Sequence, residues 1–178
     1  GYDVVIYDSA FYENQNVLSL MDTILEKDIS VAEGLLDMPE GVFNSFKNFK
    51  FVKGDIRDTE SLNKLFSENK FDYVFHLGEL VGHYRCEKDK DLTRAINYIG
   101  TKNIFDFAMK QGALFVCNSS SSVYGTREDA DDILKEDAEL FTEGLDTYCV
   151  NKLLTEKYMV NEGDKNKDFK FIILRPAT

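Results

Sequence analysis

The chain has 178 residues, with 21 Lys plus Arg against 32 Asp plus Glu, and therefore a formal net charge of −11. Nucleic acids and anionic membranes are bound through clusters of basic residues, so this balance favours neither partner. Hydrophobic residues make up 43% and charged residues 30%, with only 11 Gly and 2 Pro. This composition is typical of one packed globular domain rather than of a disordered or fibrous chain.

The cysteines and histidines indicate neither a disulfide framework nor a metal centre. The three cysteines are odd in number and widely spaced, which favours reduced thiols, and two histidines argue against a zinc site. No apolar stretch approaches the roughly 18 residues of a membrane span, and the first residues lack the pattern of a signal peptide. We therefore expect a soluble, cytoplasmic protein.

Five short apolar runs predict the strands of a buried sheet. The first is rich in β-branched residues and ends in an acid, Asp8. The runs are residues 2–8, 49–53, 73–77, 114–117 and 169–174.

Helical patterns lie between these runs, over residues 59–69 with Thr59 as N-cap, 92–111 and 147–161. Strands that alternate with helices imply right-handed crossovers and a parallel sheet covered on both sides. We therefore predict one doubly wound α/β, Rossmann-like domain over residues 1–178. The polar segments 9–48, with an expected helix at 17–27, and 126–146 follow strand ends, where such sheets bind ligands.

Four serines, residues 119–122, directly follow the fourth predicted strand. Hydroxyls at a carboxyl strand end can hold a substrate oxygen. Taken alone, the run is better explained as a Ser-rich turn that satisfies its own backbone.

Tyr148 and Lys152 are four residues apart, which places them on one helix face. Tyr84/Lys88 and Tyr98/Lys102 share this spacing, but only Tyr148/Lys152 opens a helix after the serine strand. A phenol with a pKa near 10 is a poor base at neutral pH. A neighbouring ammonium would lower that pKa, and a serine hydroxyl would hold the reacting oxygen during hydride transfer. The order Ser, Tyr, Lys therefore predicts a dehydrogenase-type site.

Several motifs in the same order resemble the extended short-chain dehydrogenase/reductases, and among them the NAD-dependent nucleotide-sugar epimerases that UDP-glucose 4-epimerase typifies. The motifs are residues 4–8, 54–58, 73–78, 97–101, 119–125, 148–152 and 174–176. The resemblance covers essentially the whole chain and implies an isomerase with tightly bound NAD.

The resemblance also implies roles for individual residues. Ser120, Tyr148 and Lys152 match the catalytic hydroxyl, the base and its helper, with Lys152 also binding the nicotinamide ribose. Asp8 matches the acid that binds the adenosine ribose and selects NAD over NADP. The remaining matches to cofactor-binding positions are Ser9, Asp55, Ile56, Leu77, Gly78, Glu79, Asn97 and Ala177. His76 is expected to be a packed strand residue rather than a catalyst.

Departures from the family pattern restrict these inferences. The glycine-rich fingerprint expected before Gly1 and the substrate lobe expected after Thr178 are absent, so the chain resembles a fragment of such an enzyme. Glu79 stands where the family has a small residue, which would place a carboxylate near the cofactor phosphates.

The two positions after Ser120 help to select the reaction. Sugar dehydratases resemble one another in carrying Asp-Glu there, whereas this chain has Ser121 and Ser122. This favours epimerisation of a nucleotide sugar. A related NAD(H)-dependent dehydrogenase or reductase, and a catalytically degenerate binding module, remain the alternatives. The resemblance further implies a homodimer formed by the helices at 92–111 and 147–161.

Overall fold

The computed structural model describes residues 2–9, 49–125, 134–138, 140 and 144–176. The expected helix at 17–27 and the predicted cofactor residue Ala177 lie outside these residues. The chain forms two compact units, residues 1–55 and residues 56–178. Each unit is considered by itself below.

The first unit contains two parallel strands, β1 (Val4–Asp8) and β2 (Phe49–Lys53). The chain leaves β2 through Gly54, where a Cβ atom would collide with the ring of Tyr7. The Tyr7 hydroxyl in turn donates a hydrogen bond to the Asp55 carbonyl at 3.0 Å. Only glycine therefore permits this close approach at the strand ends.

The second unit contains a three-stranded parallel sheet in the order β3-β4-β5, formed by Tyr73–His76, Leu114–Asn118 and Phe171–Leu174. Helices connect the strands, as the alternating pattern predicts. They are α3 (Thr59–Glu68), α4 (His83–Lys88), α5 (Lys90–Arg94), a π-helix (Ala95–Gly100), α6 (Thr101–Gln111), a 3₁₀ turn (Ser121–Tyr124) and α7 (Thr147–Lys165).

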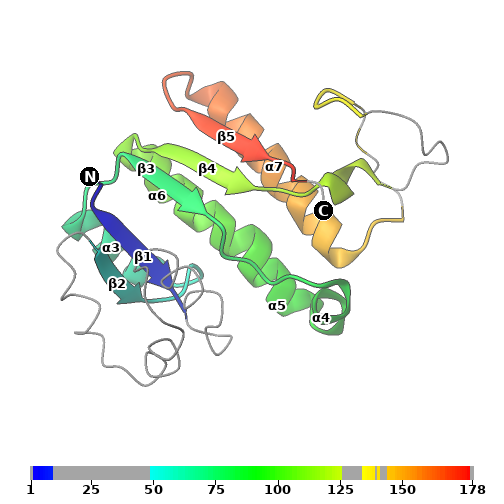
Figure 1. Ribbon diagram of the computed structural model, residues 1–178, viewed down its shortest axis with the longest axis horizontal. Helices are drawn as coiled ribbons and strands as arrows, with labels where there is room; N and C mark the ends of the chain where they lie inside the picture. Colours follow the sequence, from blue (N-terminus) through cyan, green and yellow to red (C-terminus); the bar gives the residue numbers. More distant parts are fainter. Residues whose placement is uncertain (1, 10–48, 126–133, 139, 141–143, 177–178) are drawn as a thin grey trace, which may run out of the picture. The chain divides into compact units, whose positions relative to one another are not determined.

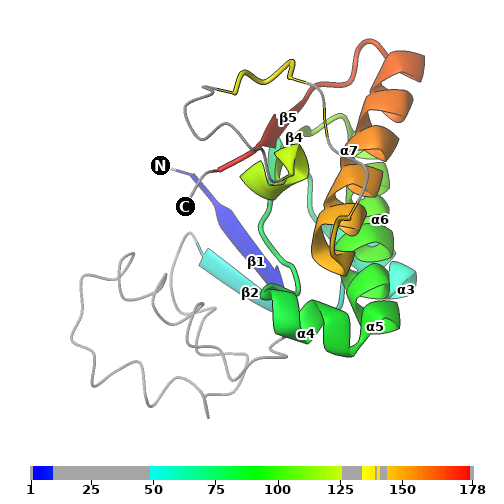
Figure 2. The same cartoon turned by 90° about the vertical axis from the view of Figure 1, so that its right-hand side faces the viewer.

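The core of this unit lies between the sheet and helices α3, α6 and α7, which share one face of the sheet (Figures 1 and 2). Phe105 of α6 is fully buried there. Its ring packs edge-on against Phe115 of β4 at 5.2 Å and Phe171 of β5 at 5.7 Å between centroids. Edge-to-face packing of this kind stabilises the helix-covered face.

The other face of this sheet carries large apolar side chains that are 45–66% exposed, namely Tyr73, Phe75, Ile172 and Leu174. The strand register aligns them, because Phe75 pairs with Val116 and Val116 with Ile172. The expectation of helices on both faces is therefore met on only one face by the described residues.

Helix boundaries differ from the predicted ones for local reasons. Asp58 rather than Thr59 is the N-cap of α3, since its Oδ1 accepts the Glu60 N–H at 3.0 Å. The single helix predicted over residues 92–111 is divided by the π-helix, and α7 continues to Lys165. The predicted strands at 49–53, 73–77 and 114–117 agree to within one residue at either end.

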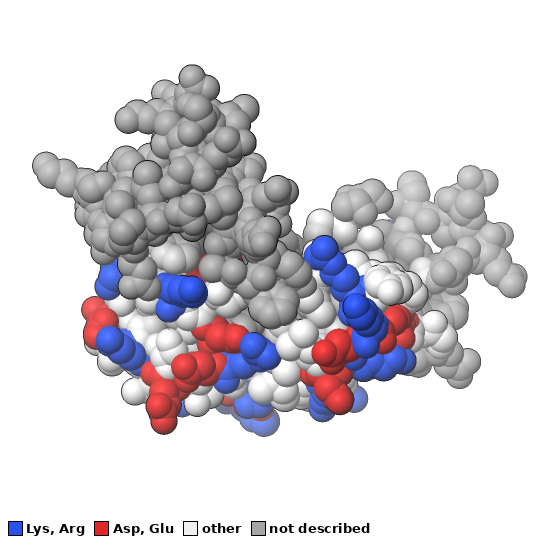
Figure 3. All heavy atoms as spheres, turned by 90° about the horizontal axis from the view of Figure 1, so that it is seen from below, with Lys and Arg blue, Asp and Glu red and all other residues white. Residues whose placement is uncertain are grey.

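Charges on the surface are interspersed rather than segregated. Figure 3 shows acidic and basic side chains alternating over one face, and short-range pairs such as Lys90–Glu87 at 2.8 Å and Lys165–Glu162 at 2.6 Å contribute to this pattern. Exposed pairs of this kind add little to stability. Among the described helices, none has the length and apolarity needed to cross a membrane.

Candidate active site

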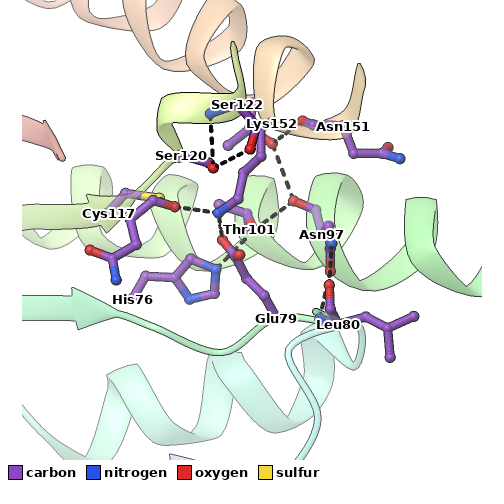
Figure 4. A network of polar contacts seen from close by, with 12 residues as sticks. His76, Glu79, Leu80, Asn97, Thr101, Cys117, Ser120, Ser122, Asn151 and Lys152 are labelled. Atoms are coloured by element: carbon purple, nitrogen blue, oxygen red, sulfur yellow. Dashed lines mark hydrogen bonds and ion pairs between the residues drawn. The ribbon is translucent and has the colours of Figure 1, made fainter. Parts of the chain in front are cut away.

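The three predicted catalytic residues converge where β4 ends beside the start of α7. Lys152 is buried, with its side chain 2% exposed, and its Nζ donates to the Asn118 carbonyl at 2.5 Å and to a carboxylate oxygen of Glu79. Figure 4 shows Lys152 reaching from α7 toward Glu79 on the loop after β3. The site is thus built from the ends of two neighbouring strands and one helix.

Tyr148 lies one helical turn before Lys152. The Lys152 ammonium is 5.5 Å from the centroid of the Tyr148 ring, and the Ser120 side chain is near enough to the phenol to lower its pKa. The start of α7 is fixed by Asp146, whose Oδ1 accepts the Cys149 N–H at 2.7 Å. The fixed helix start determines where the phenol lies relative to the serine turn.

Ser120 fits both interpretations of the serine run, a local turn and a hydroxyl at the site. Its backbone is extended, and its Oγ accepts the Ser122 N–H at 3.1 Å, which caps the 3₁₀ turn. The same hydroxyl donates to the Ser122 Oγ at 3.0 Å (Figure 4). Ser120 is therefore both a turn residue that satisfies local backbone and a hydroxyl positioned beside Tyr148.

The electrostatics of Tyr148 differ from the sequence prediction. Burial, and then the Glu79 carboxylate, raise the pKa of Tyr148 to about 12, while the Ser120 side chain opposes this rise. The sequence predicts the reverse, a phenol pKa lowered by Lys152. The prediction is wrong because burial of the phenol, followed by the charge of Glu79, raises the pKa of Tyr148.

Glu79 is the unexpected member of the site. Its side chain is 6% exposed, and burial raises its pKa to about 7 even though Lys152 lowers it. The sequence marked Glu79 as a departure from the family pattern. Its contact with Lys152, 73 residues further along the chain, carries no local sequence signal.

Asn97 and His76 support the loop and the strand below the site. The Asn97 carbonyl, on the π-helix, accepts from the hydroxyls of Thr101 at 2.8 Å and Thr155 at 3.1 Å. His76 is 3% exposed and bonds Thr101 at 2.8 Å, and burial lowers its pKa to about 3. His76 is thus a neutral packed residue, as expected.

Arg175, to which the sequence analysis assigns no role, connects the end of β5 to the site. Its guanidinium contacts both carboxylate oxygens of Glu156, at 3.0 and 2.7 Å, and donates to the Tyr124 hydroxyl at 2.9 Å. This cluster holds the turn after Ser120 against α7. The sequence offers only the helical spacing of Glu156, four residues after Lys152, and no signal of its contact with Arg175.

The remaining predicted residues are described within their own units. In the first unit, Asp8 ends β1 and Ser9 follows it, and the Gly54 N–H before Asp55 donates to the Asp8 carbonyl at 2.9 Å. In the second unit, the Ile56 carbonyl accepts from Asn103 at 3.1 Å. Leu77 and Gly78 are exposed on the loop after β3.

A family model described as "NAD dependent epimerase/dehydratase family" matches residues 4–178. The chain belongs to this family. A pea "Bifunctional UDP-glucose 4-epimerase and UDP-xylose 4-epimerase 1" is 31% identical over 156 residues, which are 83% of this chain and 42% of that protein. A decarboxylating sterol-4-alpha-carboxylate 3-dehydrogenase of Saccharomyces cerevisiae is 25% identical, over 98% of this chain and half of the yeast protein.

Solved structures of the family share the fold. The UDP-glucose-4-epimerase of Stenotrophomonas maltophila, crystallised with NAD and formylated UDP-arabinopyranose, superposes with a TM-score of 0.75 at 23% identity, over 98% of this chain and 45% of that one. The chain thus spans about half the length of the family members it matches. The Rossmann-like fold predicted from the sequence is confirmed.

Proposed function

We propose that the protein catalyses NAD-dependent epimerisation of a nucleotide sugar. The observation that carries the proposal is the convergence of Ser120, Tyr148 and Lys152, three residues from two elements, at the carboxyl end of β4. Relatives with UDP-glucose 4-epimerase activity in their names support the same reaction class.

The residues of the site fit a nicotinamide cofactor. An ammonium has three N–H donors, and two of those on Lys152 are used by Asn118 and Glu79, so one is available for a ribose hydroxyl. Asp8, at the end of β1, has the chemistry to accept from the adenosine ribose. Bound NAD would supply the hydride acceptor and later the hydride donor.

The proposed roles of the side chains follow from their contacts. Tyr148 would act as the phenolate, whose oxygen takes the proton of the sugar hydroxyl and returns it after the hydride has moved back. Ser120 would hold the same sugar oxygen by a hydrogen bond. Lys152 would stabilise the phenolate by its positive charge, which lies 5.5 Å from the centroid of the Tyr148 ring.

The serine turn supports epimerisation rather than dehydration. Ser121 and Ser122 occupy the 3₁₀ turn after Ser120, and Ser122 is hydrogen-bonded to it. Elimination of water from a sugar needs an acid and a base near the reacting carbons. Hydroxyls at these positions do not supply an acidic proton or a strong base at neutral pH.

The test combines a variant with cofactor analysis of the full-length protein. Tyr148→Phe should abolish interconversion of UDP-glucose and UDP-galactose while the protein stays folded and retains about one NAD per chain after purification. Tyr158→Phe is the matched control, since Tyr158 is on the same helix but bonds Asp106 at 2.5 Å, away from the site. Full activity of Tyr148→Phe would refute the proposal.

Two results would select the alternatives. The yeast dehydrogenase relative makes net oxidation the second candidate, and stoichiometric consumption or production of NADH would identify it. A full-length protein that binds neither NAD nor NADH would be a degenerate binding module.

We also propose a homodimer that uses the helices from α5 to α7. Ile99 on the π-helix and Val150 and Val160 on α7 are 39–48% exposed, which leaves apolar surface for a helix partner. Light scattering of the purified protein should give twice the mass of the chain. Ile99→Lys combined with Val160→Lys should shift the mass to that of the monomer.

A further inference from the structure

Glu79 and Lys152 form a buried ion pair in the centre of the site. The exposed fractions of the two side chains are 6% and 2%, so neither charge is compensated by solvent. A buried carboxylate is stable only while it is paired or protonated, because the loss of hydration is expensive. Any ligand that binds Lys152 therefore alters the environment of Glu79.

A ribose diol presents two hydroxyl oxygens, whereas Lys152 has one N–H beyond those given to Glu79 and Asn118. The Asn118 carbonyl belongs to β4 and has no freedom to move away, so the side chain of Glu79 is the partner that can be displaced. We propose that Glu79 is a positioning residue that competes with the cofactor for Lys152 and takes up a proton from solvent when a ribose binds there. This inference rests on the proposed NAD site.

The proton balance of this exchange is simple. Lys152 keeps its proton and changes its acceptor from the Glu79 carboxylate to a ribose oxygen. The displaced carboxylate binds one proton from water and becomes a neutral acid, which removes the unpaired buried charge. The two negative charges of a cofactor pyrophosphate favour the same protonation.

Glu79 is the described group that can titrate near neutral pH in this cluster. The ionisable groups that face it from the packed elements are His76 on β3, Cys86 on α4, Cys117 on β4, and Tyr148 and Lys152 on α7. The pKa of His76 is lowered to about 3, and burial raises those of Cys117 and Tyr148 to about 12. With a pKa of about 7, Glu79 accounts for proton uptake at pH 7 to 8.

The experiment is a titration of the full-length protein with NAD at pH 6 to 8.5. For wild type, the affinity should fall with rising pH above 7 and approach a tenfold loss per pH unit, as expected for uptake of one proton. Glu79→Gln should bind NAD with an affinity that is nearly independent of pH. Glu156→Gln is the matched control, since it also breaks a buried ion pair, with Arg175, and should keep the wild-type pH dependence.

Each outcome separates this inference from the function on which it rests. The role of Glu79 is overturned if wild type binds NAD with no pH dependence, or if Glu79→Gln shows the same pH dependence as wild type. Either result leaves the NAD site in place. Absence of NAD binding at every pH overturns both. If Glu79→Gln does not fold, calorimetry of wild type at pH 7.5 in phosphate and in Tris measures proton uptake directly, and a value of zero refutes the proposal.

Discussion

The side-chain amide of Asn97 binds both main-chain groups of Leu80. Its Nδ2 donates to the Leu80 carbonyl at 2.9 Å, and its Oδ1 accepts the Leu80 N–H at 2.8 Å. Asn97 is 1% and Leu80 4% exposed, so these bonds are shielded from water. The pair fixes the backbone next to Glu79 from a helix 17 residues further along the chain.

Asn97→Ala should destabilise the protein more than its small loss of volume suggests. The Leu80 N–H would stay buried without a partner, and the Leu80 carbonyl would keep only the Cys86 thiol at 3.4 Å, at a cost of about 2 kcal/mol in the free energy of unfolding. Chemical denaturation monitored by circular dichroism measures this change. Asn103→Ala removes one partly buried bond to the Ile56 carbonyl and should cost about 1 kcal/mol. Equal losses in the two variants would contradict the argument.

The π-helix that carries Asn97 could not be predicted from the sequence, whereas most of the strands could. Short apolar runs locate the parallel strands well, and residues 49–53 match β2 at both ends. The predicted helix over 92–111 is divided where the Asn97 carbonyl accepts a hydrogen bond from Thr155 of α7. A contact 58 residues away leaves no trace in helical periodicity.

The same limit applies to the site. The spacing of Tyr148 and Lys152 predicts their proximity, because residues four apart share a helix face. The sign of the shift in the Tyr148 pKa could not be predicted, since it depends on burial and on Glu79, which a different loop supplies.

Gly100 permits the close packing of the π-helix against Ile56. A Cβ atom at residue 100 would lie 2.5 Å from Cγ1 and 2.6 Å from Cδ1 of Ile56. Gly100→Ala should therefore lower the free energy of unfolding by about 2 kcal/mol through overpacking. The double variant Gly100→Ala with Ile56→Ala should lose less free energy of unfolding than the sum of the losses in the two single variants. Strictly additive losses in denaturation experiments would argue against the clash.

Arg175 holds Glu156 by two hydrogen bonds, with their side chains 19% and 6% exposed. Arg175→Met should cost about 4 kcal/mol, because it leaves the Glu156 carboxylate buried and unpaired. Arg175→Lys should cost about half as much, since an ammonium keeps the charge but not the two-point geometry. Adding Glu156→Gln to Arg175→Met should restore part of the stability in the same denaturation assay. No recovery would show that the loss comes from packing alone.

His76 should make the folded protein sensitive to acid. Its pKa falls from 6.5 to about 3 because burial, and then Lys152, disfavour the imidazolium. Between pH 6.5 and 3, His76 is therefore protonated in the unfolded chain and neutral in the folded chain. The stability contributed by neutral His76 is lost as the pH falls through this range. The loss should reach about 3 kcal/mol by pH 4.5. Glu79 acts in the opposite direction, because its pKa rises from 4.5 to about 7.

Two variants separate these opposing contributions. His76→Gln keeps a donor for Thr101 but cannot titrate, so its stability relative to wild type should rise steadily as the pH is lowered from 6.5 to 4.5. For Glu79 the folded state binds more protons than the unfolded state between pH 4.5 and 7, so wild type should lose stability relative to Glu79→Gln as the pH rises through that range. Denaturation at closely spaced pH values gives both difference curves. If the two stability differences changed in the same direction with pH, the result would contradict the opposite effects of burial on the pKa of the base His76 and the acid Glu79.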